Sequence, residues 1–163
     1  MAHRYLIALG SNQRHPRFGD PRKVLAAALK EMQGKGLSLL TVSPVYVSAP
    51  VGPSLRRYAN GAALIETALD PEALLAHLQA IEARFGRKRR GQPWRARVLD
   101  LDIVLWSRGA FAAPRLTLPH VQFRHRAFVL QPAQTIAADW RDPISGFTIR
   151  QLHSRLTRPR PVP

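Results

Sequence analysis

The chain has 163 residues, enough for one domain with a single substantial core. A hydrophobic fraction of 45% argues against a disordered chain, the absence of cysteine excludes disulfides and thiolate chemistry, and no apolar run reaches the roughly 18 residues that a membrane-spanning helix needs. The formal net charge of +15 attracts polyanions, either a nucleic-acid backbone or a small polyphosphate. The apolar stretch near the N-terminus is too short for a secretory signal, so we expect a protein of the cytoplasm.

The first two predicted elements are a strand and a helix. The apolar run 5–9 indicates a buried strand, which ends in a turn at Gly10. Asp20-Pro21 combines a capping carboxylate with proline at the first helical position, so a helix begins there and ends before Gly34. Its apolar residues recur at helical spacing: Val24, Leu25, Ala28, Leu29 and Met32.

A second unit follows with two strands and a helix. Residues 37–47 are predicted to be a strand that breaks at Pro44, residues 48–53 a loop, and residues 58–67 a further strand. Asp70-Pro71 repeats the helix-start chemistry. The buried stripe of this second helix is predicted to be Leu74, Leu78, Ile81 and Phe85.

The segment 98–106 has the strongest strand pattern in the sequence. It completes the order strand, helix, strand, strand, helix, strand. That order is typical of the ferredoxin-like α+β fold.

The pattern is less regular after this strand. We expect a short strand near Leu116, irregular turns around Pro119 and Pro132, and a small helix over 148–156. No repeat or low-complexity linker divides the chain, so residues 1–157 are predicted to form one domain. Residues 158–163, rich in arginine and proline, are predicted to be a disordered tail.

Two carboxylates in the last strand of this pattern are the main candidates for chemistry. Side chains alternate across a strand, so Asp100 and Asp102 point to one face and the aliphatic residues of 99–103 to the other. A spacing of roughly 6–7 Å along the backbone suits two hard cations about 3.5–4 Å apart. An amphipathic strand with an exposed wet face explains the same pattern. Two of the chain's ten acids nevertheless follow Arg97 closely, which favours a metal and its anionic ligand.

The segment before this strand is strongly basic. From Arg84 to Arg97 there are seven basic residues and no acid. Its guanidinium groups, Arg89 among them, match phosphate oxygens, and Trp94 offers a ring that stacks on a base or heterocycle. A solvated basic loop is the alternative to a loop that closes over bound nucleotide and excludes water.

Two further pairs have both a functional and an ordinary explanation. His120 can donate to a phosphate and Arg126 can clamp one, although a lone histidine is more often structural. Tyr58 and Asn60 share a strand face, and together they offer an aromatic plane and an amide that can pair with a heterocycle. As strand residues they need no such role.

A third pair lies on the second predicted helix. Gln79 and Glu82 are three residues apart and share a helix face near its C-terminal end. The residues alone identify them as surface residues.

Taken together, these pieces resemble the 6-hydroxymethyl-7,8-dihydropterin pyrophosphokinase family. The matching residues occur in family order from residue 4 to about 138, and the LDLDI run at 99–103 joined to R-x-F-x-L at 126–130 is the most specific part. The other matches are ALGSN at 8–12, YAN at 58–60, IE at 81–82, GR at 86–87, Trp94, Arg97 and LPH at 118–120.

The resemblance implies a three-layer ferredoxin-like α/β/α fold with a mainly antiparallel sheet. It implies transfer of the β,γ-diphosphate of ATP to the hydroxymethyl group of 6-hydroxymethyl-7,8-dihydropterin, with release of AMP, in folate biosynthesis. Asp100 and Asp102 would hold two Mg²⁺ ions, with ATP as co-substrate. The implied partners are these small molecules rather than a membrane or nucleic acid, and the implied state is a monomer.

The resemblance also assigns residues to each substrate. Asp100, Asp102, Arg89 and Arg97 would be catalytic. ATP would be contacted by Gln79, Glu82, Arg89, Trp94, the backbone of Ile103, Arg115, Thr117, His120 and Arg126. The pterin would lie against Ser48, Val51, Tyr58, Asn60, Trp94, Asp100 and Phe128.

The sequence departs from the family's usual pattern in four places, one of which is the usual acidic P-L-x-E-I-A-P segment, which reads PAQTIAA at 132–138. Pro93 replaces a basic residue before the loop tryptophan, Arg95-Ala96 replaces Gly-Pro, and Val121 replaces proline or an aromatic residue after the histidine. A diverged relative that binds pterin or nucleotide with weak or altered activity is therefore one alternative. A basic nucleic-acid-binding module is another, supported only by the net charge and the basic segments.

Overall fold

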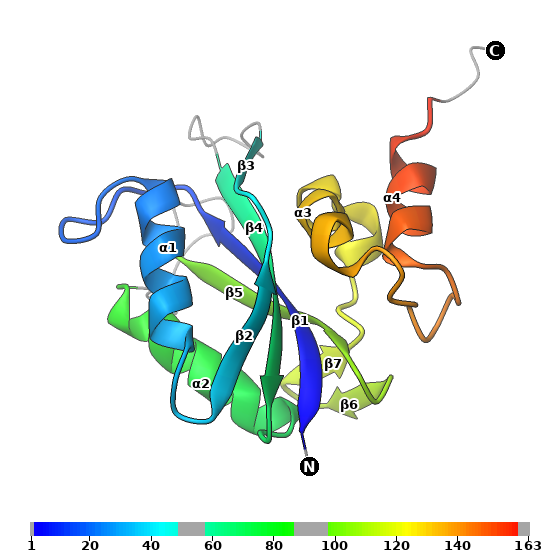
Figure 1. The fold of residues 1–163 in the computed structure, drawn as a ribbon, viewed down its shortest axis with the longest axis horizontal. Helices are drawn as coiled ribbons and strands as arrows, with labels where there is room; N and C mark the ends of the chain where they lie inside the picture. The colour runs from blue at the N-terminus through cyan, green and yellow to red at the C-terminus, as the bar shows by residue number, and fades with distance from the viewer. Residues whose placement is uncertain (1, 49–57, 87–97, 160–163) are drawn as a thin grey trace.

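The computed structural model describes residues 2–48, 58–86 and 98–159 (Figure 1). Among these residues no helix is long and apolar enough to cross a membrane. The elements in chain order are β1 His3–Ser11, α1 Pro21–Met32, β2 Leu37–Val42, β3 Tyr46–Ser48, β4 Tyr58–Thr67, α2 Pro71–Arg84, β5 Asp100–Trp106, β6 Phe111–Ala113, β7 Leu116–Leu118, the 3-10 helix η1 Phe123–His125, α3 Ala127–Ala137 and α4 Ile149–Thr157. The predicted tail lies mostly outside the described residues and stays a prediction.

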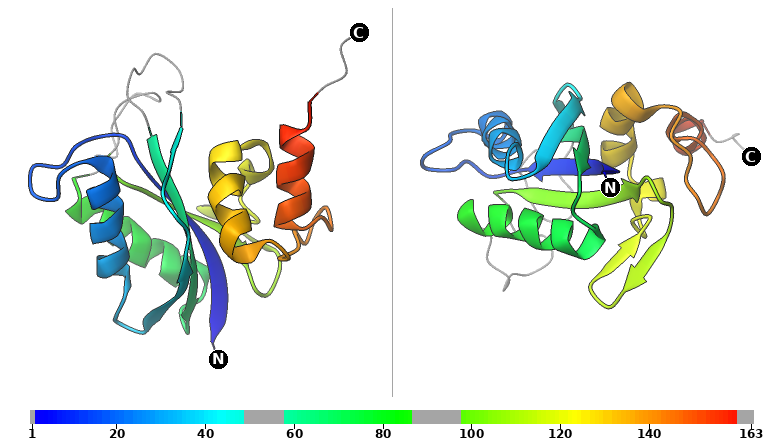
Figure 2. Two further views of the ribbon diagram at one scale, coloured as in Figure 1. Left: turned by 45° about the horizontal axis from the view of Figure 1, so that its top comes forward. Right: turned by 60° about the horizontal axis from the view of Figure 1, so that its bottom comes forward.

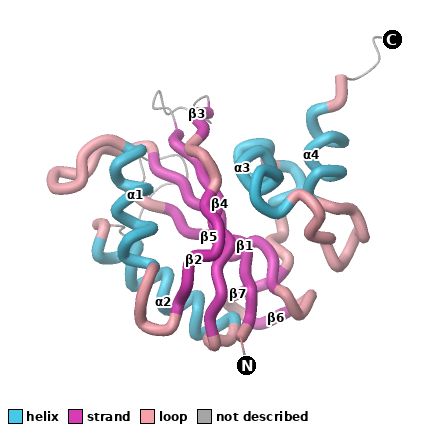
Figure 3. Tube along the Cα trace, viewed as in Figure 1, coloured by secondary structure: helices cyan, strands magenta, loops and turns pink. Residues whose placement is uncertain are grey.

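The main sheet has the strand order β2-β4-β1-β5, with β3 also paired to β4, and every pairing is antiparallel. Helices α1 and α2 cover one face, and α3 packs on the other with α4 against it (Figures 1 and 2). Strands and helices thus form three layers (Figure 3). The predicted ferredoxin-like α+β fold is confirmed.

Both predicted helix starts are confirmed in atomic detail. Asp20 accepts a hydrogen bond from the backbone N–H of Lys23 at 3.0 Å, and Asp70 accepts one from Ala73 at the same distance. Each satisfies a donor that the first turn of a helix leaves unpaired. All four residues of the predicted α2 stripe are buried, so this helix faces the sheet as its pattern indicated.

The predicted strand over 37–47 is divided where Pro44 removes a backbone donor. β2 ends and β3 begins on either side of this residue, and both pair with β4. Ser43 bridges the gap, because its N–H donates to the carbonyl of Ala62 at 2.9 Å and its hydroxyl accepts from the N–H of Ala62 at 2.8 Å. The chain therefore crosses the break without losing its place beside β4.

Two hydrophobic cores lie on opposite faces of the sheet. Alternate residues of β1 belong to different cores, with Ile7 and Leu9 facing α1 and α2 and Leu6 and Ala8 facing α3. This period of two is what a strand covered on both faces requires. The core beneath α3 contains Val104 and three buried residues of that helix, Val129, Leu130 and Ala133.

The expectation of irregular turns around Pro132 is wrong. α3 runs through this residue, although a proline inside a helix costs about 3 kcal/mol relative to alanine. Val129, Leu130 and Ala133 are buried against the sheet, and Pro132 is itself buried. Burial of these apolar side chains outweighs the lost backbone hydrogen bond.

A buried ion pair joins the segment before α3 to the turn before α4. The carboxylate of Asp142 has no exposed surface and receives two hydrogen bonds from the guanidinium of Arg124. Burial alone would raise the pKa of Asp142. Hydrogen bonds from Arg124, Ser145 and Ile144, and the charge of Arg124, outweigh burial and lower the pKa to about 2.

This shift predicts an acid-dependent loss of stability. A carboxylate whose folded pKa lies below its ordinary value of 3.8 stabilises the fold above that pH, and the contribution disappears as the pH falls through the folded pKa. It amounts to about 2 kcal/mol for Asp142. Urea denaturation followed by circular dichroism between neutral pH and pH 2 should show this loss in the unmodified protein and a correspondingly flatter profile in Asp142→Asn.

Asp139→Asn is the matched control, since Asp139 also pairs with an arginine, Arg150, but both side chains are mainly exposed. Exposed pairs contribute little, so its profile should follow that of the unmodified protein. An Asp142→Asn profile as steep as the unmodified one would contradict the prediction.

Candidate active site

The register of the sheet brings two of the predicted site residues, Asn60 and Asp100, together. Asn60 in β4 pairs with Gly10 in β1, and Gly10 pairs with Asp100 in β5. Directly paired residues point to the same face of a sheet, so Asn60 and Asp100 stand on one face with a glycine between them. Tyr46 of β3 continues this row beyond Asn60.

This face is the one covered by α3. Leu101 and Ile103 are buried in the core beneath α1 and α2, so Asp100 and Asp102 point the other way and are half-buried. The alternation predicted from the sequence is confirmed. In β4 the same argument applies to Asn60, because Ala62, two residues on, belongs to the core beneath α3.

The pterin residues predicted by resemblance lie beside this row. Tyr58 is two residues before Asn60 on the same face of β4, and Ser48, at the end of β3, pairs with Tyr58. Phe128 lies in the first turn of α3 and packs against the core on this face. The structure thus places Tyr58, Asn60, Phe128 and Asp100 around one side of the sheet.

Gly10 places no side chain between Asn60 and Asp100, on the sheet face that α3 covers. A Cβ atom built there would lie 3.6 Å from Oδ1 of Asn60, which is ordinary van der Waals contact. The position therefore accepts a larger residue without a clash. The glycine keeps open the space between the amide of Asn60 and the carboxylate of Asp100.

An irregularity in β5 anchors His120. The pairing with β1 passes from Leu105 to Ile103 and skips Val104, which marks a β-bulge. The carbonyl of Val104 accepts a hydrogen bond from the backbone N–H of His120 at 3.0 Å. The bulge thus holds His120 alongside β5, next to the aspartate pair.

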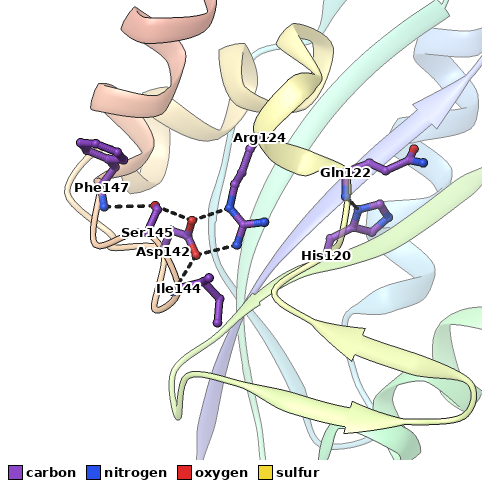
Figure 4. Close-up of polar contacts among 7 residues, drawn as sticks. All are labelled: His120, Gln122, Arg124, Asp142, Ile144, Ser145 and Phe147. Carbon is purple, nitrogen blue, oxygen red and sulfur yellow. Dashed lines mark hydrogen bonds and ion pairs between the residues drawn. The ribbon is translucent and has the colours of Figure 1, made fainter.

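The hydrogen bonds of His120 define its neutral form. Nδ1 accepts from the N–H of Gln122 at 3.1 Å, so the proton of the neutral ring is on Nε2 (Figure 4). Burial lowers the pKa of His120, the charge of Asp102 opposes this, and the charge of Arg126 adds to it. The lowered pKa favours a neutral ring that offers an Nε2–H donor.

Arg126 is the N-cap residue of α3. Along the chain it lies between His120, a predicted nucleotide contact, and Phe128, a predicted pterin contact. Its guanidinium donates to the side-chain carbonyl of Gln122 and lies 5.6 Å from the centre of the Phe128 ring. Its backbone carbonyl accepts from Leu130, which begins the helix. His120, Arg126 and Phe128 thus follow one another along a single short segment.

Glu82 is a site residue whose environment the sequence pattern alone misjudged. It is 6% exposed, and its Oε2 accepts a hydrogen bond from the backbone N–H of Leu101 at 2.8 Å. The expectation of a surface residue is wrong. The helical spacing contains the correct signal, since Glu82 is four residues after the buried Leu78 and therefore on the same face of α2.

Among the described residues, the remaining predicted nucleotide contacts lie on β5 and on or beside two elements that contact it, α2 and β7. Helix α2 and strands β5 and β7 contact one another. Gln79 is half-buried on α2, Thr117 is exposed in β7, and Arg115 is exposed just before it. Because Leu101 directs its N–H towards Glu82, the alternation of a strand directs the backbone of Ile103 to the same outer edge.

Four predicted site residues lie outside the described residues: Val51, Arg89, Trp94 and Arg97. The departure from the family pattern at Val121 lies on the surface, where its side chain is 64% exposed. This substitution therefore leaves the packing around His120 undisturbed.

The donor set fits magnesium held jointly with a phosphate ligand. No group of three or more His, Asp or Glu side chains that could hold a metal occurs in the described part of the chain. Asp100 and Asp102 supply two carboxylates on one face. Mg²⁺ is ordinarily bound by one or two carboxylates together with substrate phosphates and waters, so two aspartates suffice.

Three proteins from bacteria resemble this chain in sequence. It is 42% identical over 145 residues to the 2-amino-4-hydroxy-6-hydroxymethyldihydropteridine pyrophosphokinase of Pseudomonas aeruginosa, covering 88% of this chain and 86% of that protein. It is 38% identical over 151 residues to the Synechocystis enzyme of the same name, covering 92% and 74%. It is 43% identical over 135 residues to the Haemophilus influenzae one, covering 82% and 81%.

The fold is shared with solved structures. The crystal structure of an HPPK-DHPS in complex with substrates matches 95% of this chain with a TM-score of 0.74 and 12% identity. Wild-type Plasmodium falciparum HPPK-DHPS with SDX-DHP matches 95% with a TM-score of 0.71 and 12% identity. This chain spans less than half the length of those chains, 43% and 44%.

The family model described as 7,8-dihydro-6-hydroxymethylpterin-pyrophosphokinase (HPPK) matches residues 6–138. That range contains the aspartate pair, the tyrosine–asparagine pair, His120 and Arg126. The chain belongs to the 7,8-dihydro-6-hydroxymethylpterin-pyrophosphokinase family.

Proposed function

We propose that this chain transfers the β,γ-diphosphate of ATP to the hydroxymethyl group of 6-hydroxymethyl-7,8-dihydropterin and releases AMP, on the route to folate. The observation that carries this is the row across the sheet, in which Asn60, Gly10 and Asp100 share one face. A heterocycle paired to the amide of Asn60 would lie on the same face of the sheet as the carboxylates of Asp100 and Asp102. The family supports the same reaction.

The nucleotide half of the site is built for negative charge. Asp100 and Asp102 would hold two Mg²⁺ ions, which would neutralise negative charge on the phosphates. His120 would donate its Nε2–H to a phosphate oxygen, and Arg126 would bind another with its guanidinium. From the resemblance we add Arg89 and Arg97 as phosphate contacts. Gln79, Glu82, the backbone of Ile103, Arg115, Thr117 and Trp94 complete the assigned nucleotide site.

The pterin half is built for a flat polar ring. The pterin would lie between the rings of Tyr58 and Phe128, with its edge paired to the amide of Asn60. Gly10 supports this position, because it adds no side chain between Asn60 and Asp100 on this face. Ser48, Val51 and Trp94 are added from the resemblance.

The transfer requires orientation more than a strong base. The hydroxyl oxygen attacks the β-phosphorus in line. A new oxygen–phosphorus bond forms, the bond from the β-phosphorus to the bridging oxygen on the α-phosphate breaks, and the hydroxyl proton is released. Asp100 would orient the hydroxyl, because it stands in the same row as Asn60 and is two residues from Asp102 on one strand face. The predicted monomeric state and cytoplasmic location stay predictions.

Release of AMP tests the proposed reaction directly. The purified protein with ATP, Mg²⁺ and hydroxymethyl-dihydropterin should form AMP, and Asp100→Ala and Asp102→Ala should each lower kcat by roughly 100-fold or more. Asp139→Ala, which removes an exposed carboxylate far along the chain, should retain full activity. Pterin binding without AMP formation in the unmodified protein would support a diverged relative, and salt-sensitive binding of duplex DNA a nucleic-acid-binding module.

Glu82 is predicted to support catalysis through the backbone. Glu82→Ala leaves the buried N–H of Leu101 without this acceptor, which costs about 1–3 kcal/mol, and loosens β5 between the two aspartates. We expect the Mg²⁺ concentration for half-maximal activity to rise by roughly tenfold. Glu82→Gln keeps an acceptor oxygen and should recover much of the loss. Unchanged magnesium dependence in a folded Glu82→Ala variant would disprove this role.

Gly10→Ala is predicted to weaken pterin binding and leave the fold intact. The added methyl group meets no clash within 3.6 Å, yet it fills the floor between Asn60 and Asp100. Calorimetric titration should show weaker binding of the pterin, and the thermal midpoint should be close to that of the unmodified protein. A matched control is Gly86→Ala, at a positive φ with open space around it, which should change stability and not pterin affinity. Equal pterin affinity in Gly10→Ala would place the ring elsewhere.

A further inference from the structure

The Arg124–Asp142 pair has the geometry of a fixed connection. The guanidinium donates through Nη2 to Oδ1 at 2.8 Å and through Nε to Oδ2, so both carboxylate oxygens are engaged (Figure 4). The side chain of Arg124 is 23% exposed and that of Asp142 is fully buried. A two-point contact of this kind fixes direction as well as distance. The pair therefore restrains how the backbone at Arg124 is oriented.

Asp142, the acidic member of the pair, is itself fixed by further hydrogen bonds. Ser145 donates its hydroxyl to Oδ2 of Asp142 at 2.6 Å, and the N–H of Ile144 donates to Oδ1 at 3.0 Å. The N–H of Asp142 donates to the carbonyl of Phe147 at 2.8 Å, which closes the turn. Asp142 thus organises the turn 142–147 and presents its carboxylate to Arg124 from a rigid base.

Arg124 lies in the middle of the segment that carries the proposed nucleotide contacts. The segment runs from His120 to Arg126, with η1 between them. Its beginning is fixed by the bond from His120 to Val104, and Phe123, 1% exposed, fixes its inner side. Figure 4 shows the side chain of Arg124 directed to Asp142, away from His120 and Gln122.

We propose that Asp142, acting through Arg124, positions His120 and Arg126 for the phosphates of ATP. This rests on the proposed function. The pair sets the rotation of η1 and so the direction in which its two flanking side chains leave the backbone. Asp142 lies beyond residue 138, where the match to the family model ends, so this support comes from outside the matched region.

The pair also decides which cation meets the nucleotide. Asp142 neutralises the charge of Arg124 and keeps it in the turn, so Arg126 is the guanidinium of this segment left to face the phosphates. The pterin contacts depend on other forces. Tyr58 and Asn60 are fixed by the ladder of β4, and α3, which carries Phe128, is fixed by its own buried face. Loss of the pair should therefore weaken nucleotide binding selectively.

The test measures binding of the two substrates separately in Asp142→Asn and Arg124→Lys. We expect the Kd of a non-hydrolysable ATP analogue with Mg²⁺ to rise roughly tenfold in Asp142→Asn. Arg124→Lys keeps the charge and loses the two-point fork, so it should shift the same Kd in the same direction by less. The Kd of the pterin should be unchanged, and the KM for ATP should rise more than kcat falls.

Asp139→Asn is the control, because it breaks an exposed ion pair in the same part of the fold and should leave both constants unchanged. Circular dichroism at the assay temperature confirms that each variant is folded, and the milder Arg124→Lys carries the test if Asp142→Asn unfolds. Equal losses of pterin and nucleotide affinity would indicate general loosening and overturn the proposal, as would nucleotide affinity within about twofold of the unmodified protein. Absence of AMP formation in the unmodified protein would instead count against the proposed function, since analogue binding reports on positioning alone.

Discussion

The site depends first on the alternation of side chains along β5. Leu101 and Ile103 enter the core beneath α1 and α2, and each such burial contributes about 1.5–3 kcal/mol. The same register forces Asp100 and Asp102 to the opposite face. A slip of one residue would drive two carboxylates into the apolar core, at a desolvation cost that unpaired charges do not recover. The direction of the carboxylates is therefore fixed by hydrophobic packing beneath them.

β5 is an edge strand of the main sheet, and the contacts that cover its edge also build the site. An uncovered edge leaves backbone groups open to pairing with other chains. Here the carboxylate of Glu82 accepts a hydrogen bond from the backbone N–H of Leu101. The backbone N–H of His120 donates to the carbonyl of Val104, at the bulge. These two contacts thus give hydrogen-bond partners to backbone groups on the open edge of β5. They also place Glu82 and His120 next to the aspartate pair.

Local patterns in the sequence predicted the elements, and non-local contacts account for what they missed. The caps at Asp20 and Asp70 and the alternation around Asp100 are encoded within a few residues, so they could be recognised from spacing alone. The helix through Pro132 could not, because burial against a distant sheet overrides a local propensity. The environment of Glu82 was visible in its helical spacing, but its partner, a backbone N–H nineteen residues away, was not.

The two halves of the site are held by different kinds of interaction. The pterin half stands on β3, β4 and β1, where paired backbones fix Asn60 and Gly10 whatever the neighbouring side chains are. The nucleotide half depends on side-chain contacts, above all those of Glu82 and Arg124. A backbone ladder survives most substitutions, whereas a side-chain contact is lost with either partner. Sequence change in this fold should therefore alter how ATP is held more readily than how the pterin is recognised.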